Sequence, residues 1–157
     1  MMRTPFSIVI LVILFGTITI LWGGCKPQEP ANLTICVEGR ELSDAEIIID
    51  EKSVGFLMQT VIMADGKIYI NGVLAARGRR DKNAEHNDSY SGCSSTFTLA
   101  SGKHTITLRG KNAQPLTLVA DIMPGHHMLT YLPDKSSIKW NGKPFQVGPE
   151  RKVTITS

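Results

Sequence analysis

Short runs of β-branched and aromatic residues, separated by turn residues, extend over most of this chain of 157 residues. Runs of this length and spacing are typical of antiparallel strands in a sandwich or small barrel. In Thr105–Leu108 and Val153–Thr156 apolar residues alternate with threonine, so one side of each strand enters a core and the other meets water. The sequence therefore predicts an all-β fold, a small antiparallel β-sandwich, in residues 32–157. The predicted strands are Leu33–Val37, Ile47–Ile49, Lys67–Ile70, Thr96–Leu99, His104–Leu108, Leu116–Ile122, His127–Leu132, Ser137–Trp140 and Val153–Thr156.

Three segments repeat the order strand, turn, strand: residues 48–55, 68–74 and 138–145. The second and third contain Asn-Gly, which a type I′ turn favours because both of its central residues take positive φ. A contrary signal runs from Ser43 to Glu46, where a capping-box pattern allows a helix through residue 62. We favour strand and turn there, because a helix would place several charges in its middle.

An apolar run without a charge, Phe6 to Trp22, follows Arg3 at the start of the chain. Residues 1–24 are predicted to be a signal peptide. An uncleaved signal anchor is the alternative, since about 17 apolar residues just reach the length of a spanning helix. In both cases the positive charge of Arg3 stays inside, which places the rest of the chain outside the cytoplasm.

Gly23-Gly24-Cys25, directly after this run, resembles the lipobox of bacterial lipoprotein precursors. The resemblance implies cleavage before Cys25, which would then carry diacylglycerol and an N-acyl chain and anchor the protein in a membrane. Residues 25–31 would be this lipidated cysteine and a stiff, proline-containing linker. The implied location is the cell envelope, facing the periplasm or the exterior. Lys26 after the cysteine is compatible with the outer membrane if the cell is a diderm.

Once Cys25 is assigned to lipid, two of the three cysteines remain, Cys36 and Cys93. We predict that they form a disulfide, because an exposed free thiol rarely persists in an oxidising compartment. This bond would tie the first strand to the end of the longest polar loop. The alternative is two unpaired thiols.

Residues 67–132 resemble the PEGA domain, a small β-sandwich of bacterial envelope and surface proteins. The resemblance rests on Ile68–Gly72 as an opening strand and turn, on Leu99–Leu108 with its Gly-Lys-His centre, and on Ile122–Leu132 as a closing hairpin. Residues 77–95 would be an insertion. The resemblance implies a non-catalytic module that spaces, docks or binds at the cell envelope.

The long polar segment 77–95 contains a candidate site for an anionic ligand, formed by Arg77, Arg79, Arg80 and Lys82. Anionic lipid or a cell-wall polymer would be the ligand. The alternative is a solvated loop, because Asp81, Glu85 and Asp88 largely cancel these charges. We expect residues 77–91 to be exposed, with few apolar contacts.

Residues that carry catalysis or bind metals do not form a recognised motif in this sequence. The sequence contains no Gly-x-Ser-x-Gly nucleophile elbow, no Gly-x-Gly-x-x-Gly dinucleotide-binding motif, no His-Glu-x-x-His zinc motif and no Cys-x-x-Cys. His126 and His127 are adjacent, so on a strand they would point to opposite faces. His104 shares an alternation face with Ile106, so we expect its ring against apolar neighbours. No catalytic residue, metal or cofactor is therefore predicted, and Asp50 has no assignable partner.

Two further observations narrow the function. The net charge of +3 is too small to indicate a nucleic-acid partner. Met58 and Met63, near Phe56 and Leu57, form either an apolar binding stripe or, as we favour, part of the core.

The sequence thus predicts a membrane-anchored envelope lipoprotein that acts as a non-catalytic binding, docking or structural module. Its partner would be an envelope protein or a cell-wall or other anionic polymer. The alternative is a small envelope hydrolase or a carbohydrate-active accessory enzyme that uses His86, His104 or the pair His126-His127.

Overall fold

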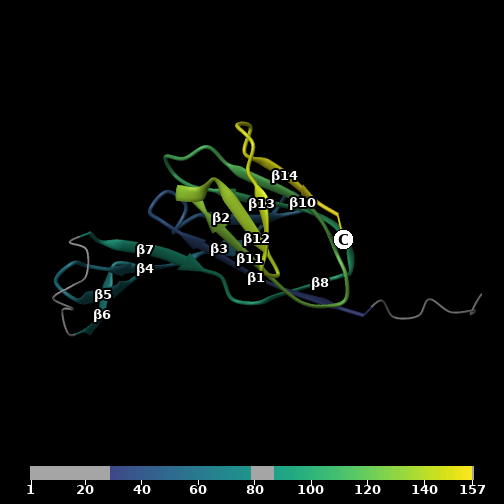
Figure 1. Ribbon diagram of the computed structural model, residues 1–157. Helices are drawn as coiled ribbons and strands as arrows, with labels where there is room; N and C mark the ends of the chain where they lie inside the picture. The colour runs from purple at the N-terminus through teal and green to yellow at the C-terminus, as the bar shows by residue number, and fades with distance from the viewer. Residues whose placement is uncertain (1–28, 79–86, 157) are drawn as a thin grey trace, which may run out of the picture.

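The computed structural model describes residues 29–78 and 87–156, which form two β-sheets packed face to face (Figure 1). The predicted all-β sandwich is confirmed. Sheet A has nine strands: β1 (Ala31–Glu38), β4 (Met58–Ile62), β5 (Lys67–Ile70), β6 (Val73–Arg77), β7 (Ser89–Cys93), β8 (Phe97–Leu99), β11 (Gly125–Leu132), β12 (Ser137–Trp140) and β13 (Lys143–Gln146). Sheet B has five: β2 (Glu46–Ile49), β3 (Lys52–Phe56), β9 (Gly102–Arg109), β10 (Leu116–Ile122) and β14 (Lys152–Ile155). A 3-10 helix, η1 (Pro133–Lys135), joins β11 to β12.

The sheets are mixed rather than purely antiparallel. Sheet A has the order β13-β12-β11-β1-β7-β4-β5-β6, with β8 also on β1, and sheet B has the order β14-β10-β9-β2-β3. β1 pairs in parallel with β11, and β10 in parallel with β14. Alternation of apolar and polar residues shows which face of a strand is buried but carries no information on strand direction. The parallel pairs therefore left no signal in the sequence.

The core lies between the two sheets and is built by alternate residues of their central strands. On β1, Leu33, Ile35 and Val37 are buried, while the residues between them are partly exposed. Ile106 and Leu108 of β9 do the same from sheet B. This period of two gives each sheet one apolar face, and packing those faces together removes them from water.

Residues 43–62, for which the sequence left a helix open, form no helix. They form β2, β3 and β4, and Asp50 and Glu51 make the turn between the first two with φ of 49° and 67°. The predicted strand and turn is confirmed here. Positive φ at both positions is also found at the two predicted Asn-Gly turns.

The three hairpin turns share one hydrogen-bonding arrangement. In each, the first turn residue donates its backbone N–H to a carbonyl of a third strand, and its side-chain Oδ1 accepts the N–H of that same residue. The pairs are Asp50 with Thr105 (2.9 and 2.9 Å), Asn71 with Gln59 (2.8 and 2.9 Å) and Asn141 with Met128 (2.9 and 2.9 Å). An Asp or Asn side chain at the turn thus adds one residue to the hydrogen bonding between the hairpin and the third strand. This explains why the three segments resemble one another in sequence.

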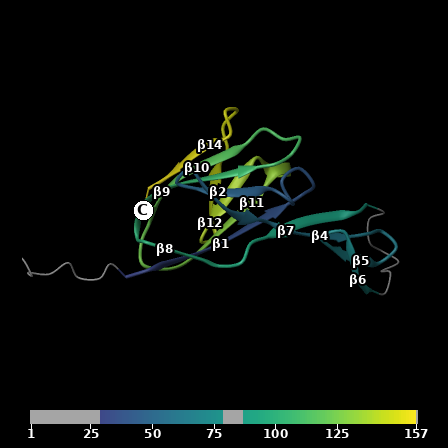
Figure 2. The ribbon, with the colours of Figure 1, turned by 180° about the vertical axis from the view of Figure 1, so that it is seen from behind.

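Strands β4, β5 and β6, called the arm below, extend away from the two packed sheets (Figures 1 and 2). β7 pairs with β4 on one side and with β1 on the other, so it joins the arm to the body. In both views the start of β1 lies at the opposite end of the molecule from β5 and β6.

The strand β7 corrects our expectation of an exposed loop through residue 91. Residues 89–93 lie inside sheet A, and Gly92 is buried. Within this strand Gly92 lies against the backbone of Ser43, where no side chain fits.

Candidate functional site

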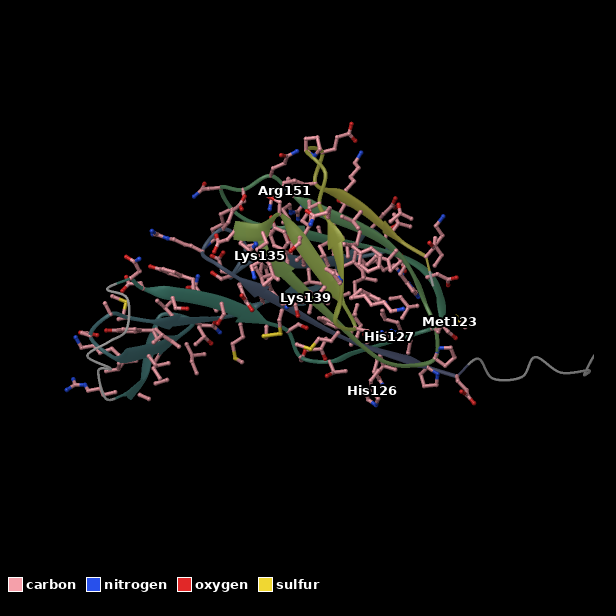
Figure 3. All side chains as sticks on the ribbon, in the orientation of Figure 1. Met123, His126, His127, Lys135, Lys139 and Arg151 are labelled. Atoms are coloured by element: carbon pink, nitrogen blue, oxygen red, sulfur yellow. A yellow bond between two sulfur atoms is a disulfide. The ribbon has the colours of Figure 1, made fainter. Side chains whose placement is uncertain are left out.

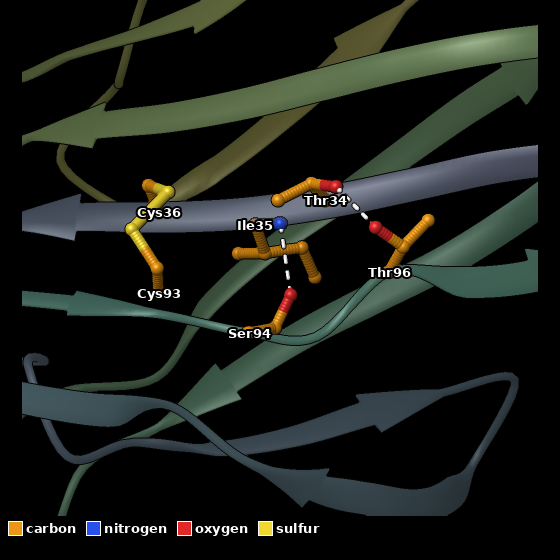
Figure 4. The surroundings of a disulfide bond; sticks show 6 residues. All are labelled: Thr34, Ile35, Cys36, Cys93, Ser94 and Thr96. Atoms are coloured by element: carbon orange, nitrogen blue, oxygen red, sulfur yellow. Dashed lines mark hydrogen bonds between the residues drawn. A yellow bond between two sulfur atoms is a disulfide. The ribbon is translucent and has the colours of Figure 1, made fainter.

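The predicted disulfide between Cys36 and Cys93 is present, and it lies where the arm meets the body (Figure 4). The two residues are directly opposite on β1 and β7, with Cα atoms 4.1 Å apart. Beside it, the N–H of Ile35 donates to Ser94 Oγ at 3.0 Å, and the hydroxyls of Thr34 and Thr96 are 3.1 Å apart. A covalent bond at the end of β7 and hydrogen bonds from the residues just after it therefore hold this segment to β1.

A second set of contacts holds the arm to the loop before β2. Gln59 on β4 donates from Nε2 to Ser43 Oγ at 2.8 Å, and the guanidinium of Arg40 lies over the ring of Tyr90 at 5.3 Å. Gly92 lies so close to this loop that an added Cβ would be 2.0 Å from the carbonyl oxygen of Ser43. Only glycine fits at this point of the junction.

The strand registers divide the side chains of the arm between two faces. Thr60 faces Ile70, and Ile62 faces Ile68, while on β6 Val73 and Ala76 lie opposite Ile70 and Ile68. Because directly paired residues share a face, these side chains lie on the same side as Cys93, away from the core of the sandwich. We call this surface the outer face of the arm; its apolar members are Met58, Ile62, Ile68, Ile70, Val73 and Ala76.

The outer face of the arm is open to solvent. Met58 is 51% exposed, Ile62 46% and Val73 69%. The core position that we favoured for Met58 is wrong, because β4 belongs to the arm and turns this side chain outward. Leu57, its neighbour, is buried in the core, whereas Phe56 is exposed on β3 and Met63 is half-buried.

The charged residues of the arm lie on its other face. Lys67 is paired with Arg77 in the register, one position away from Ile68 and Ala76, and its ammonium group forms an ion pair with Asp65. Arg77, the first residue of the predicted cationic loop, is exposed at the end of β6. Arg79, Arg80 and Lys82 lie outside the described residues, as does His86.

His104 has hydrogen-bond acceptors at both ring nitrogens. Its Nδ1 is 2.6 Å from Oδ2 of Asp50, and its Nε2 is 2.7 Å from the carbonyl oxygen of Ala100. Both nitrogens must carry a proton to satisfy both acceptors, which describes the imidazolium form. Our expectation of apolar surroundings is therefore incomplete: the ring is half-buried at the strand end but held by polar partners, and Asp50 does have one.

The pKa values of this pair follow from their surroundings. Burial of the ring acts to lower the pKa of His104, but hydrogen bonds to Asp50 and Ala100 and the charge of Asp50 together raise it above its ordinary value. Burial likewise acts to raise the pKa of Asp50. The N–H of Thr105 and the His104 ring outweigh it and hold that pKa below the usual range.

His127 occupies the equivalent place at the Asn141 turn, and Figure 3 labels it beside His126. Its Nε2 is 2.7 Å from the carbonyl oxygen of Met123, and its Nδ1 is 3.0 Å from Nδ2 of Asn141. Its ring stacks on Trp140, with centroids 5.4 Å apart. His126, the adjacent residue, is exposed.

These histidines do not come together in a concave site. Among residues 29–78 and 87–156, the best-formed surface grooves are lined by residues other than His104, His126 and His127. His104 touches a carboxylate, but its Nε2 already donates to Ala100, so it offers no lone pair to activate a nucleophile. In the part of the chain that the structure describes, no group of three or more His, Cys, Asp or Glu side chains is arranged to hold a metal. The same residues include no helix with the length and apolar character needed to cross a membrane.

A comparison of the chain with protein-family models, with curated proteins and with solved structures finds no match. The resemblances to a lipobox and to a PEGA domain therefore stay predictions. The strands that carry the second resemblance are divided between the sheets: β5 belongs to sheet A, and β9 to sheet B.

Proposed function

We propose that this chain is a membrane-anchored lipoprotein of the cell envelope. The sequence supports the anchor: an apolar run follows Arg3, Gly23-Gly24 precedes Cys25, and a short linker reaches the folded domain. β1 begins at Ala31, six residues after Cys25, so little chain separates the lipid from the sandwich. The domain then faces the periplasm or the exterior, in the outer membrane if the cell is a diderm.

Its proposed role is non-catalytic docking, and the observation that carries this role is the outer face of the arm. Contiguous exposed apolar side chains on a folded protein mark an interaction surface more often than scattered ones do. The strands β5 and β6 of the arm lie at the far end of the molecule from the start of β1 (Figure 1). On the anchored arrangement the arm points away from the lipid, toward other envelope components. Binding of an anionic polymer by Arg77 and the loop after it stays a separate prediction.

The anchor is tested by metabolic labelling with a fatty-acid analogue in the cell. The wild-type protein should take the label and lose residues 1–24, and Cys25→Ser should abolish the label. Cys36→Ser is the matched control, which should remain labelled. A protein of full-length mass with Met1 intact would establish the uncleaved signal anchor instead.

A further inference from the structure

We propose that the outer face of the arm is the contact surface between two copies of this chain, packed face to face across a twofold axis. This names the partner of the proposed docking module. It rests on the proposed function only for the orientation of the two copies.

The first argument is the segregation of charge on the arm. On β4, β5 and β6 the outer face contains apolar side chains and Thr60, with no ionisable group. The neighbouring strand β7 adds Ser89, Ser91 and the disulfide-bonded Cys93, and exposed Glu38 of β1 lies at its border, opposite Ser91. Lys67 and Arg77 are both on the other face. A sheet with charge on one side only is the pattern of a sheet whose uncharged side packs against another layer. Sheet B lies on the other side of sheet A, so it leaves the outer face of the arm uncovered.

The second argument selects the occupant. In a twofold dimer the same patch meets itself, so any charge on it would face a like charge or a desolvated surface. The outer face of β4, β5 and β6 carries no charge, so it avoids this penalty and is complementary to itself, with Glu38 of β1 outside the contact. A membrane surface fits less well, because helices and sheets that lie on lipid place Lys and Arg around their apolar side chains. Here the cations of the described arm point the opposite way.

The third argument is geometric. Facing sheets pack about 10 Å apart with their side chains interdigitated. The outer face offers large side chains, Met58 and Ile62, beside small ones, Ala76 and Ser91, as interdigitation requires. Two copies anchored in one membrane through equivalent linkers would hold their arms at equal distance from it, and confinement to the membrane raises their effective concentration.

The test is sedimentation of the full-length protein in density-matched detergent. The wild type should sediment as a dimer that dissociates on dilution. Val73→Asp should weaken the dimer at least about tenfold, because it buries an unpaired carboxylate in the contact. Phe56→Asp is the matched control: Phe56 has the same 69% exposure as Val73 but lies on β3, outside the proposed contact, so its substitution should leave the dimer unchanged.

Ile62→Asp gives a second variant in case Val73→Asp does not fold. Folding of each variant is checked by circular dichroism and by protection of Cys36 and Cys93 from alkylation. A photo-crosslinking residue at position 73 should trap a second copy in native membranes, and one at position 56 should not. A wild-type monomer at every concentration, equal weakening by Phe56→Asp, or capture of a different protein at position 73 would overturn the proposal. Fatty-acid labelling of Cys25 is read separately, so the anchor and the dimer can fail independently.

Discussion

His104 and His127 each lie beside a hairpin turn, and they differ in the side-chain atom of the turn residue that faces the ring. Asn141 Oδ1 accepts the backbone N–H of Met128, which leaves its Nδ2 to face the ring of His127. Since Nδ2 can only donate, Nδ1 of His127 must accept, and the proton lies on Nε2, where it is donated to Met123. Asp50 offers His104 a carboxylate oxygen instead. The neutral ring and the cationic ring are therefore set by an amide in one turn and a carboxylate in the other.

This difference predicts a pH dependence of stability. A raised pKa of His104 stabilises the fold fully below about pH 6.5, and the stabilisation is lost as the pH rises through the folded-state pKa. A lowered pKa of Asp50 acts above about pH 3.8, and its contribution is lost as the pH falls through the folded-state value. The pair therefore stabilises most between about pH 4 and 6.5.

Asp50→Asn should remove this contribution while keeping the bond to Thr105. We expect a loss of about 1 kcal/mol near pH 5.5 and a smaller loss near pH 8.5, where Asp50 stays ionised but His104 is no longer charged; the value is modest because the Asp50 side chain is 49% exposed. Thermal unfolding at both pH values measures it. Glu51→Gln, in the same turn, removes an equal charge and should change neither value. An equal loss at both pH values would show that His104 is not cationic in the fold.

Gly92 is the residue on which the arm junction depends most directly. In Gly92→Ala the new Cβ would meet the carbonyl oxygen of Ser43, which is backbone and must move with its loop. We expect a destabilisation of about 1–3 kcal/mol, the range for overpacked sites, measured by denaturant unfolding. Gly148→Ala, with no atom within 4 Å of its added Cβ, is the control and should be nearly neutral. A neutral Gly92→Ala would mean that β7 does not hold this register.

At the scale of elements, β7 is the only described strand through which the arm pairs with the body within sheet A. Three residue pairs connect β7 to β1, and the Cys36–Cys93 bond is one of them. The disulfide closes a separation of 57 residues, for which the chain-entropy model gives up to about 4 kcal/mol.

The double substitution Cys36→Ser and Cys93→Ser should therefore lower the free energy of unfolding by about 2–4 kcal/mol. Reduction of the wild type with a dithiol should have the same effect. The substituted protein is its own control, because the dithiol should leave it unchanged. If the variant and the oxidised wild type unfold at the same denaturant concentration, the bond does not contribute to stability.

Considering the whole molecule, the sequence predicted those parts of the fold in which local chemistry decides the structure. Asn141-Gly142 predicted a hairpin because few pairs of consecutive residues adopt positive φ at both positions. The Cys36–Cys93 pairing followed from the number of cysteines. The arm could not be predicted, because Met58 and Ile62 have the apolar character of core residues. They are exposed because strand pairing places them on the face of sheet A that points away from sheet B, which the sequence pattern alone does not reveal.

The same limit applies to the site. His104 and Asp50 are 54 residues apart, and only the pairing of β2 with β9 brings them together. The strand β7 was hidden because it contains no run of apolar side chains, and at Gly92 a backbone contact with Ser43 leaves room only for glycine. Parallel pairing of β1 with β11 was equally hidden, since the strands are joined by no short turn.

The different coverage of the arm and the sandwich predicts that they open separately. Leu33 and Ile106 lie in a core covered from both sides, whereas β6 is exposed along its whole length. Backbone amides of β5 and β6 should therefore exchange through a local opening of lower free energy than global unfolding, while those of β1 and β9 exchange only with it. Native-state hydrogen exchange of the Val73→Asp variant, in which we expect the arms to be apart, measures this directly.

Ile106→Ala separates the two openings. It should lower the opening free energy of β1 and β9 by about 2–5 kcal/mol, the cost of a large-to-small change in a core, and leave that of β5 and β6 nearly unchanged until the two become equal. In the wild type the arm amides should exchange more slowly as the protein concentration rises, because the proposed contact covers them. The opposite result would be equal changes in the hydrogen-exchange rates of arm and core amides in both variants. The molecule would then be one cooperative unit, in which every opening of the arm also opens the sandwich through β7.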